Sequence, residues 1–460
     1  MPSTLRLRLS GEVDATSLYA FRVLFGSVLA VSSARFMWNG WVTRLFGERT
    51  FFFKYWGFSW VSPLNLSGMY GVYTALCVLG IAIALGFHYR IAIVLFFLLF
   101  SYAELIDVTN YLNHYYLVSL LTLLMACFPL SAGFSLDARQ GRVVRSETIP
   151  AYVLWLFRFQ VATVYLGAAL AKCGSDWLLH GWPLNAWLGS QVDVPVVGAL
   201  LHTPHVALIA SWAGMLHDFA VPPLLLWRRT RPYAYAALLS FHATTCTWFN
   251  IGIFPVLMPL AATLFFDPGW PRRFSRLLHL GLQGPPHLGG QAAPVSRSLL
   301  AALGLYCAFQ VLVPFRTHLY GGNVLWHEQG MRWSWRVMLR DKRGSVMFRV
   351  ALADGREVRV PPRRYLTGEQ EREMAGQPDL ILQLAQHVGR DFAAQGRAPR
   401  AVYAESLVSL NGRVPVPMID PKTNLLAVAD GLGAADYILP APQGLPPSLH
   451  ASPHLAWNSR

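Results

Sequence analysis

Apolar runs of roughly 20 residues, the length that a helix needs to cross the hydrocarbon core of a bilayer, recur along this 460-residue chain. The residues are 54% hydrophobic and only 13% charged, which excludes an ordinary soluble protein of this size. We therefore predict a membrane all-α bundle of about eight or nine spans. The runs lie near residues 17–34, 69–87, 90–106, 114–130, 151–172, 206–227, 233–249, 250–266 and 298–315.

Basic residues are divided unequally between the connections on the two sides of these runs. About 13 arginines share a side with the N-terminus, against five arginines and lysines on the other side. By the positive-inside rule the N-terminus is cytoplasmic, and nine spans place the C-terminal domain outside. The dominance of arginine over lysine is typical of a GC-rich bacterial genome, so we expect a multi-pass protein of the bacterial inner (cytoplasmic) membrane.

The formal net charge of +14 raises the question of nucleic acid as a partner. The arginines are spread over short loops and the C-terminal part of the chain, without a basic run or a nucleic-acid motif. We therefore expect the lipid bilayer, and no nucleic acid, as the partner of this charge. No HExxH motif occurs, and no metal site is expected.

The pattern changes after the last apolar run. The stretch SVMFRVALADGREVRVPP alternates around an Asp-Gly turn and predicts a hairpin, and AVYAESLVSLNGRVPV returns to a strand pattern with an Asn-Gly turn. Between them, Thr367 and Gln370 form a possible capping box that opens a helix to about residue 395. We therefore divide the chain into a transmembrane bundle carrying the active site, residues 1–315, and an extramembrane α+β domain with a Pro-rich tail, residues 316–460.

One apolar run ends in a lysine, within the stretch RFQVATVYLGAALAKCGSDW. Arg158, Tyr165 and Lys172 recur in it at a spacing of seven, which leaves all three on nearly one face of a helix. The chain has only four lysines, and an amine can lose its proton whereas a guanidinium cannot. Because a low-dielectric pocket destabilises the ammonium form, Lys172 is a candidate general base. The alternative is a snorkelling lysine that anchors the end of a span.

Other polar residues gather at the same predicted boundary. Histidine and asparagine there could donate hydrogen bonds to an oxyanion formed beside the lysine. For each histidine alone, packing or a structural hydrogen bond remains the alternative. The groups concerned are Asp107, Asn113, His114, Asp176, the pair His217-Asp218 in the sixth run, and His242, which lies about 12 Å of helix from the next turn.

Taken together and in order, these segments resemble the vitamin K-dependent γ-glutamyl carboxylase family and its bacterial relatives in the horizontally transferred transmembrane (HTTM) domain group. The resemblance runs from about residue 16 to 425. It rests on SLYAFRVLFG, LGFHYRIAIVLF, Asp107…Asn113-His114, Arg158-x-Gln160…Tyr165…Lys172…Asp176-Trp177, Phe241-His242, FDPGWPRR, SWRVM at 334–338, and SLNGR…IDP at 409–421.

The resemblance implies an enzyme, a carbon-carbon lyase that couples two reactions. Reduced vitamin K (phylloquinol or menaquinol) is oxidised by O₂ to its epoxide, and the base so formed removes a γ-proton from glutamate in a peptide or protein. The carbanion then takes up CO₂. Lys172 would start the reaction by deprotonating the quinol, and His114 would stabilise the resulting anion or the substrate. The residues expected to bind the quinol are Asn113, His242, Arg158, Tyr165, Trp335 and Met338.

Two alternatives stay open. Ala171 stands where family members carry a second lysine beside Lys172, which leaves quinol oxidation better supported than carboxylation. The chain could therefore be a quinol epoxidase that does not carboxylate. It could also be a non-enzymatic quinone- or lipid-binding membrane protein, in which Lys172 and Arg158 bind a headgroup.

Overall fold

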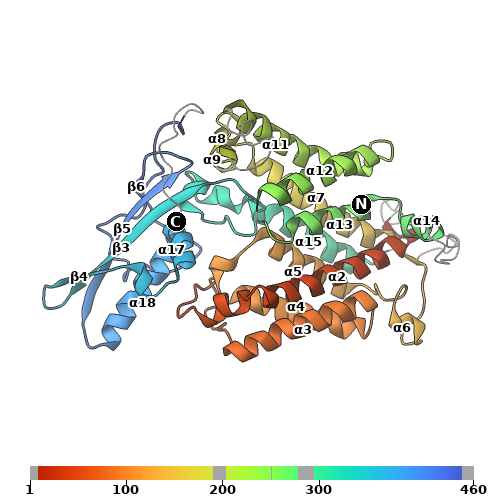
Figure 1. Cartoon of the computed structure of the whole chain (residues 1–460), viewed down its shortest axis with the longest axis horizontal. Coiled ribbons are helices and arrows are strands. Elements are labelled where there is room, and N and C mark those ends of the chain that lie inside the picture. The colour runs from red at the N-terminus through yellow and green to blue at the C-terminus, as the bar shows by residue number, and fades with distance from the viewer. Residues whose placement is uncertain (1–8, 190–203, 250, 278–294, 448–460) are drawn as a thin grey trace.

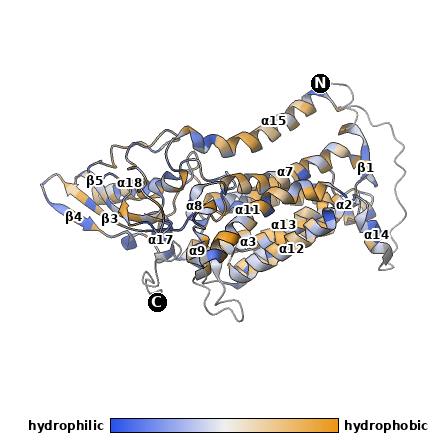
Figure 2. Cartoon of the chain, turned by 90° about the horizontal axis from the view of Figure 1, so that it is seen from above, coloured by the Kyte–Doolittle hydropathy of each residue, from blue (hydrophilic) through white to orange (hydrophobic). Residues whose placement is uncertain are grey.

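The computed structural model describes residues 9–189, 204–249, 251–277 and 295–447. The helices of the first 315 residues form a bundle, and the C-terminal region, here residues 316–447, packs against one end of it (Figure 1). Figure 2 shows that the bundle helices are predominantly hydrophobic, whereas hydrophilic residues gather in the C-terminal region and at the opposite end of the bundle. The predicted helical membrane bundle with a sheet-containing C-terminal region is therefore confirmed.

Each of the nine predicted apolar runs contains a helix. Among the described residues, five of these helices are long and apolar enough to cross a membrane, namely α2, α3, α7, α11 and α15. The other four are shorter or less apolar, so the predicted count of eight or nine spans is not confirmed. The helices are α2 (Thr16–Trp38), α3 (Leu66–Leu85), α4 (Tyr89–Leu105), α5 (Asn113–Cys127), α7 (Ala151–Ala171), α11 (Pro204–Leu226), α12 (Arg231–Trp248), α13 (Phe254–Ala262) and α15 (Arg297–Phe315).

Glycines let α2 and α3 approach each other closely. A Cβ added at Gly26 would lie 2.5 Å from the backbone nitrogen of Ala84, and one at Gly80 would lie 2.7 Å from that of Ala30. Small residues at such crossings allow two backbones to pack without intervening side chains, which is a recurrent solution inside membranes.

The C-terminal region is built on an antiparallel sheet in the order β4-β3-β5-β6. Burial alternates along the second half of β3, so every second side chain enters the core, as expected for a sheet covered on one face. The hairpins predicted at the Asp-Gly and Asn-Gly turns are confirmed. The strands are β3 (Lys342–Leu352), β4 (Glu357–Val360), β5 (Pro399–Leu410) and β6 (Val416–Pro417).

Two helices pack on this sheet where the sequence predicted one. The capping box of Thr367 and Gln370 opens α17 (Gly368–Ala375) as predicted. The helix stops at Gly376, and α18 (Pro378–Ala394) begins with a proline that is favourable in a first turn and disfavours helix in the residue before it. The chain therefore bends between the two helices, and α18 buries its apolar side against the sheet.

Shorter elements connect these parts. Strands β1 and β2 pair in a two-stranded antiparallel sheet beside the start of α2. The short elements are β1 (Glu12–Asp14), η1 (Thr43–Gly47), η2 (Val108–Asn110), α6 (Leu136–Arg139), β2 (Thr148–Pro150), α8 (Ser175–Leu178), α9 (Leu184–Gly189), η3 (Thr263–Phe265), α14 (Trp270–Leu277), η4 (Arg316–Leu319), α16 (Val324–His327) and η5 (Pro362–Arg364).

Candidate functional site

Lys172 lies immediately after α7, at the end of the bundle that meets the C-terminal region. The side chain is buried, and Nζ lies 2.8 Å from Oδ2 of Asp218 on α11. The same nitrogen lies 5.5 Å from the centre of the Trp177 ring. Lys172 therefore has a buried amine that contacts a carboxylate and an aromatic face, a different environment from that of a lysine whose amine reaches water.

Asp218 is held in turn by its neighbour. Its second oxygen, Oδ1, lies 3.1 Å from Nδ1 of His217, and the imidazole stacks on Phe241 of α12 with ring centres 4.1 Å apart. The three groups Lys172, Asp218 and His217 thus form a continuous buried chain of polar contacts. The pair His217-Asp218 can be recognised in the sequence as a polar pair inside an apolar span, but its contact with Lys172 cannot.

A second polar contact lies beside this chain. The hydroxyl of Tyr165, about two helical turns before Lys172, lies 3.1 Å from Nε2 of His242. His242 and His114 then pack on the same ring, Phe254, with ring centres 5.5 and 6.1 Å away. The structure therefore brings together the predicted residues Tyr165, His242 and His114 around one aromatic side chain of α13.

Several buried ring nitrogens in this part of the molecule have no hydrogen-bond partner within the described residues. A buried polar atom without a partner costs about 1–3 kcal/mol, so such atoms point to an absent ligand or water. Reduced vitamin K has an apolar ring system with two oxygens, which fits unpaired ring nitrogens among aromatic walls. The atoms are His114 Nε2, His217 Nε2, His242 Nδ1 and Trp335 Nε1.

Trp335 reaches this site from the C-terminal region. Its indole stacks on Tyr116 of α5 at 5.0 Å, and a Cβ added at Gly167 of α7 would come within 3.0 Å of it. Trp335 and Met338 both have a positive φ, +57° and +55°, which is strained for residues with large side chains. Strain of this kind persists where the surroundings impose it, and it concentrates at ligand sites.

Asn113 and Met338 line a cavity of about 260 Å³ between the end of the bundle and the C-terminal region. Asn113 accepts a hydrogen bond of 3.0 Å from the hydroxyl of Tyr111 and contacts the carbonyl of Arg336 through its amide. Burial raises the pKa of Glu373 and lowers that of Arg336, both in the cavity wall, because their charged forms lose water. The cavity thus has a wall of mixed polarity, and one of its lining residues, Asn113, directly precedes His114.

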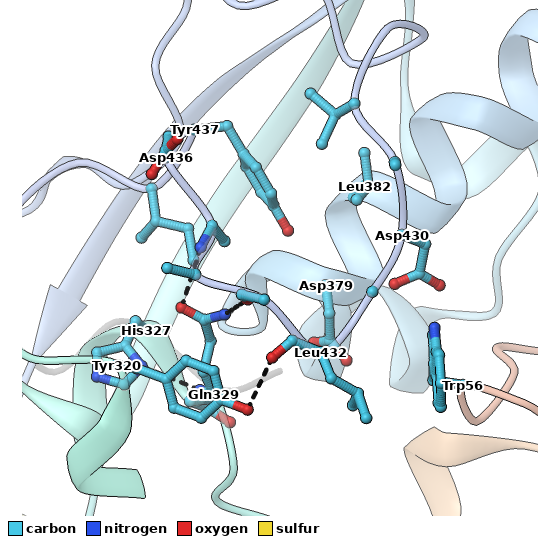
Figure 3. A pocket seen from close by; sticks show the side chains of 18 of the residues that line it. Trp56, Tyr320, His327, Gln329, Asp379, Leu382, Asp430, Leu432, Asp436 and Tyr437 are labelled. Carbon is cyan, nitrogen blue, oxygen red and sulfur yellow. Dashed lines mark hydrogen bonds between the residues drawn. The ribbon is translucent and has the colours of Figure 1, made fainter.

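A larger cavity, of about 410 Å³, lies between the C-terminal region and the loop that carries Lys54 and Trp56 (Figure 3). Trp56, Asp379 and Asp430 are among its lining residues, and Tyr320 bonds to the carbonyl of Leu432 across one side. None of the residues around Lys172 lines it. We therefore place the candidate site at Lys172, where the buried polar groups converge, and not in the larger hollow.

Arg158 lies apart from this group. It precedes Lys172 by 14 residues on a continuous helix, which is about 21 Å. Its guanidinium donates to the carbonyls of Leu264 and Phe266, at 2.8 and 3.0 Å, at the far end of the bundle. The structure therefore gives Arg158 a partner at the end of η3 and does not bring it to the other predicted site residues.

Comparison with known families covers both parts of the chain. Residues 11–270 match the HTTM domain, and residues 295–444 match the lumenal domain of vitamin K-dependent gamma-carboxylase. The chain belongs to the vitamin K-dependent gamma-carboxylase family. Membership indicates a membrane protein with a carboxylase-like function, and in this family reduced vitamin K, O₂ and CO₂ are used. No solved structure matches the chain.

The site draws on both matched parts of this carboxylase-family protein. Lys172, His114 and His242 lie within the HTTM match, whereas Trp335 and Met338 lie within the lumenal-domain match.

Proposed function

We propose that this protein is a membrane enzyme that oxidises a reduced naphthoquinone with O₂ to its epoxide and couples this oxidation to carboxylation of glutamate in a peptide or protein. The observation that carries the proposal is the buried Lys172, held by Asp218 beside several unpaired imidazole and indole nitrogens. Family membership supports the class of reaction, and the geometry supports the place where it occurs.

In this proposal Lys172 is the general base. Its neutral amine accepts the proton of a quinol hydroxyl, because an amine, unlike a guanidinium, can lose and regain its proton. His114 and His242 offer ring nitrogens to the oxygens of the bound molecule, and Trp335 offers an aromatic face. When bound, the reduced naphthoquinone supplies, through its oxidation by O₂, the driving force for removing the γ-proton of glutamate.

Exclusion of water is the second contribution of the chain. Tyr116, Phe254 and Trp335 surround the unpaired nitrogens with aromatic surface, and His114 is nearly fully buried. A strong base generated in such a place is not consumed by bulk water. The cavity at Asn113 and Met338 is the proposed entrance for the glutamate side chain.

We place the N-terminus in the cytoplasm and the C-terminal region outside the inner membrane of a bacterium. Support comes from the excess of arginine on the N-terminal side and from Figure 1, where α6 and the C-terminal region lie at opposite ends of the bundle. Counting α4, α5, α12 and α13 as spans gives nine. In this arrangement residues 1–315 hold the bundle and residues 316–460 form the outer domain.

The test is turnover by the full chain in lipid nanodiscs. Given reduced vitamin K and O₂, it should form the epoxide, detected by chromatography, and with labelled CO₂ and a glutamate-containing peptide it should fix the label. If neither product forms, the proposal is wrong, and the protein is better described as a quinone- or lipid-binding protein without enzymatic activity.

A second candidate, epoxidation without carboxylation, is favoured by one residue. Ala171 packs against a small apolar cluster around Trp177, at the position where family members carry a second lysine. Epoxide formed at the same rate with and without peptide, and no fixed label, would identify this second function.

A further inference from the structure

Asp218 faces the amine of Lys172, and its charge affects how strong a base that amine can be. An amine buried without a counter-ion is a weak base, because its protonated form is not stabilised by water. A quinol hydroxyl is a weak acid, so a weak base would take its proton poorly. A carboxylate beside the amine stabilises the ammonium form and therefore strengthens the base.

We propose that Lys172, Asp218 and His217 act as a triad, in which Asp218 supplies the base strength of Lys172 and His217 holds Asp218 in place. The inference rests on the proposed function and assigns two further positioning residues to the same site. It differs from a structural ion pair, whose only task would be to neutralise a buried charge.

The geometry supports a directed arrangement of the three groups. One oxygen of Asp218 faces Nζ of Lys172 at 2.8 Å, and the other faces Nδ1 of His217 at 3.1 Å, so both oxygens are engaged. Stacking on Phe241 fixes the imidazole plane. Nε2 of His217 is buried and has no partner among the described residues, so the contact with Asp218 is the polar contact that orients this imidazole.

The proton transfer balances without any further reagent. The quinol O–H bond breaks and the Lys172 N–H bond forms, which leaves the quinol oxygen negative and the lysine positive. Asp218 stays ionised throughout and stabilises the new ammonium by Coulomb attraction. The aspartate of a serine protease triad stabilises its imidazolium in the same way.

Other titratable groups near Lys172 do not replace Asp218. On α7 itself Tyr165 is engaged with His242 of α12, and neither carries a negative charge near neutral pH. In α8, Asp176 accepts hydrogen bonds from Arg413 and Asn411 of the C-terminal region. Within the described residues, Asp218 is the one carboxylate that forms an ion pair with Lys172.

The central experiment compares Asp218→Asn with the wild type in epoxide formation across pH. The asparagine keeps the shape but not the charge, so the amine is neutral at lower pH and is also a weaker base. We expect the rate to fall by about 10²–10⁴-fold while the acidic limb of the pH profile moves to lower pH. A rate near the wild type, or an unmoved limb, would overturn the triad. Asp267→Asn, a half-exposed carboxylate in another ion pair, is the matched control and should leave the profile unchanged.

The His217 variants test positioning and remain informative if Asp218→Asn does not fold. Asparagine at 217 can place its amide near the position of Nδ1. In His217→Asn the acidic limb of the pH profile should therefore lie at the same pH as in the wild type. His217→Ala should lower the rate and move the limb to lower pH, because Asp218 is then free to turn away. Identical profiles for the two variants would contradict the assignment.

Labelling of the lysines separates this inference from the proposed function. A small membrane-permeant acylating reagent reacts only with neutral amines, and mass spectrometry can follow the four lysines, with the exposed Lys422 as an internal reference. Lys172 in Asp218→Asn should react at lower pH than in the wild type. This readout needs no turnover, so a protein that makes no epoxide would disprove the proposed function while labelling still decides whether Asp218 controls the amine.

Discussion

Arg413 donates two hydrogen bonds of 2.7 Å to the two oxygens of Asp176, which lies four residues beyond Lys172. The guanidinium comes from the turn after β5 and the carboxylate from α8, so this pair joins the C-terminal region to the end of the bundle that carries the lysine. Asn411 donates a third hydrogen bond to Asp176, of 2.8 Å. The position of the site thus depends on a contact between two parts of the chain that are 237 residues apart.

Loss of this contact should loosen the junction. Both side chains are largely buried, at 11% and 13% exposure, so Arg413→Ala leaves a buried carboxylate without its partner. We expect destabilisation by about 2–4 kcal/mol, and a lower rate of turnover. The measurement is the thermal unfolding midpoint in nanodiscs. Arg356→Ala, which removes an arginine from an exposed ion pair of the same region, should leave the unfolding midpoint nearly unchanged.

The same contact predicts a pH dependence of stability. Burial raises the pKa of Asp176. The hydrogen bonds from Arg413 and Asn411, together with the charge of Arg413, lower it by more, so the pKa lies below the ordinary value. A carboxyl with a lowered pKa stabilises the fold above its unfolded pKa, about 3.9, and loses this contribution as the pH falls through the folded value. The difference in unfolding midpoint between the wild type and Asp176→Asn should therefore be constant from pH 7 to 5 and shrink below pH 4. A difference independent of pH would contradict this view.

Local pattern was enough to predict the apolar helices of the bundle, the hairpins and the capping box, because each of these depends on residues a few positions apart. It did not reveal the partner of Lys172, since Asp218 lies 46 residues away and many folds could bring other groups there. Helical spacing placed Arg158 on the face of Lys172, but spacing says nothing about depth in the membrane. The left-handed backbone of Trp335 and Met338 depends on packing between the two parts of the chain and leaves no mark in composition.

Quinol binding should depend on Trp335. The indole stacks on Tyr116 and leaves Nε1 unpaired, so we expect it to form one wall of the binding site. A ligand that binds only the folded state raises the unfolding midpoint by mass action. Reduced vitamin K should therefore shift the wild-type midpoint in a saturable way, and Trp335→Ala should remove most of the shift. A full shift in that variant would place the binding site elsewhere.

Arg158→Ala should lower the stability of the protein but leave quinol binding intact, in contrast to Trp335→Ala. The guanidinium is tied to the carbonyls of Leu264 and Phe266, so its loss should lower the unfolding midpoint without ligand. Because Arg158 lies far from Lys172 along α7, the shift produced by reduced vitamin K should persist. If the shift disappears while the protein stays folded, Arg158 contributes to binding after all.

Topology can be tested with reporters at two places. The loop around α6 and the C-terminal region lie at opposite ends of the bundle in Figure 1, so they should lie on opposite sides of the membrane. A periplasmic reporter fused after residue 430 should be active, and the same reporter inserted at residues 131–150 should be inactive. Equal activity at both places would contradict the arrangement of spans.

Substitution of Lys172 separates a general base from a membrane anchor. An anchor needs only a long cation, so Lys172→Arg should be tolerated in that case. A general base needs an amine that can be neutral, and a guanidinium cannot serve. We expect Lys172→Arg and Lys172→Met to lower epoxide formation by about 10²–10⁴-fold, while both proteins fold and still gain thermal stability from the quinol. The arginine keeps a cation opposite Asp218, so its failure would not arise from a lost ion pair. An added small primary amine should restore part of the rate in Lys172→Ala, because it resupplies the base. If Lys172→Arg retains most of the wild-type rate, Lys172 is an anchor and the proposed mechanism is wrong.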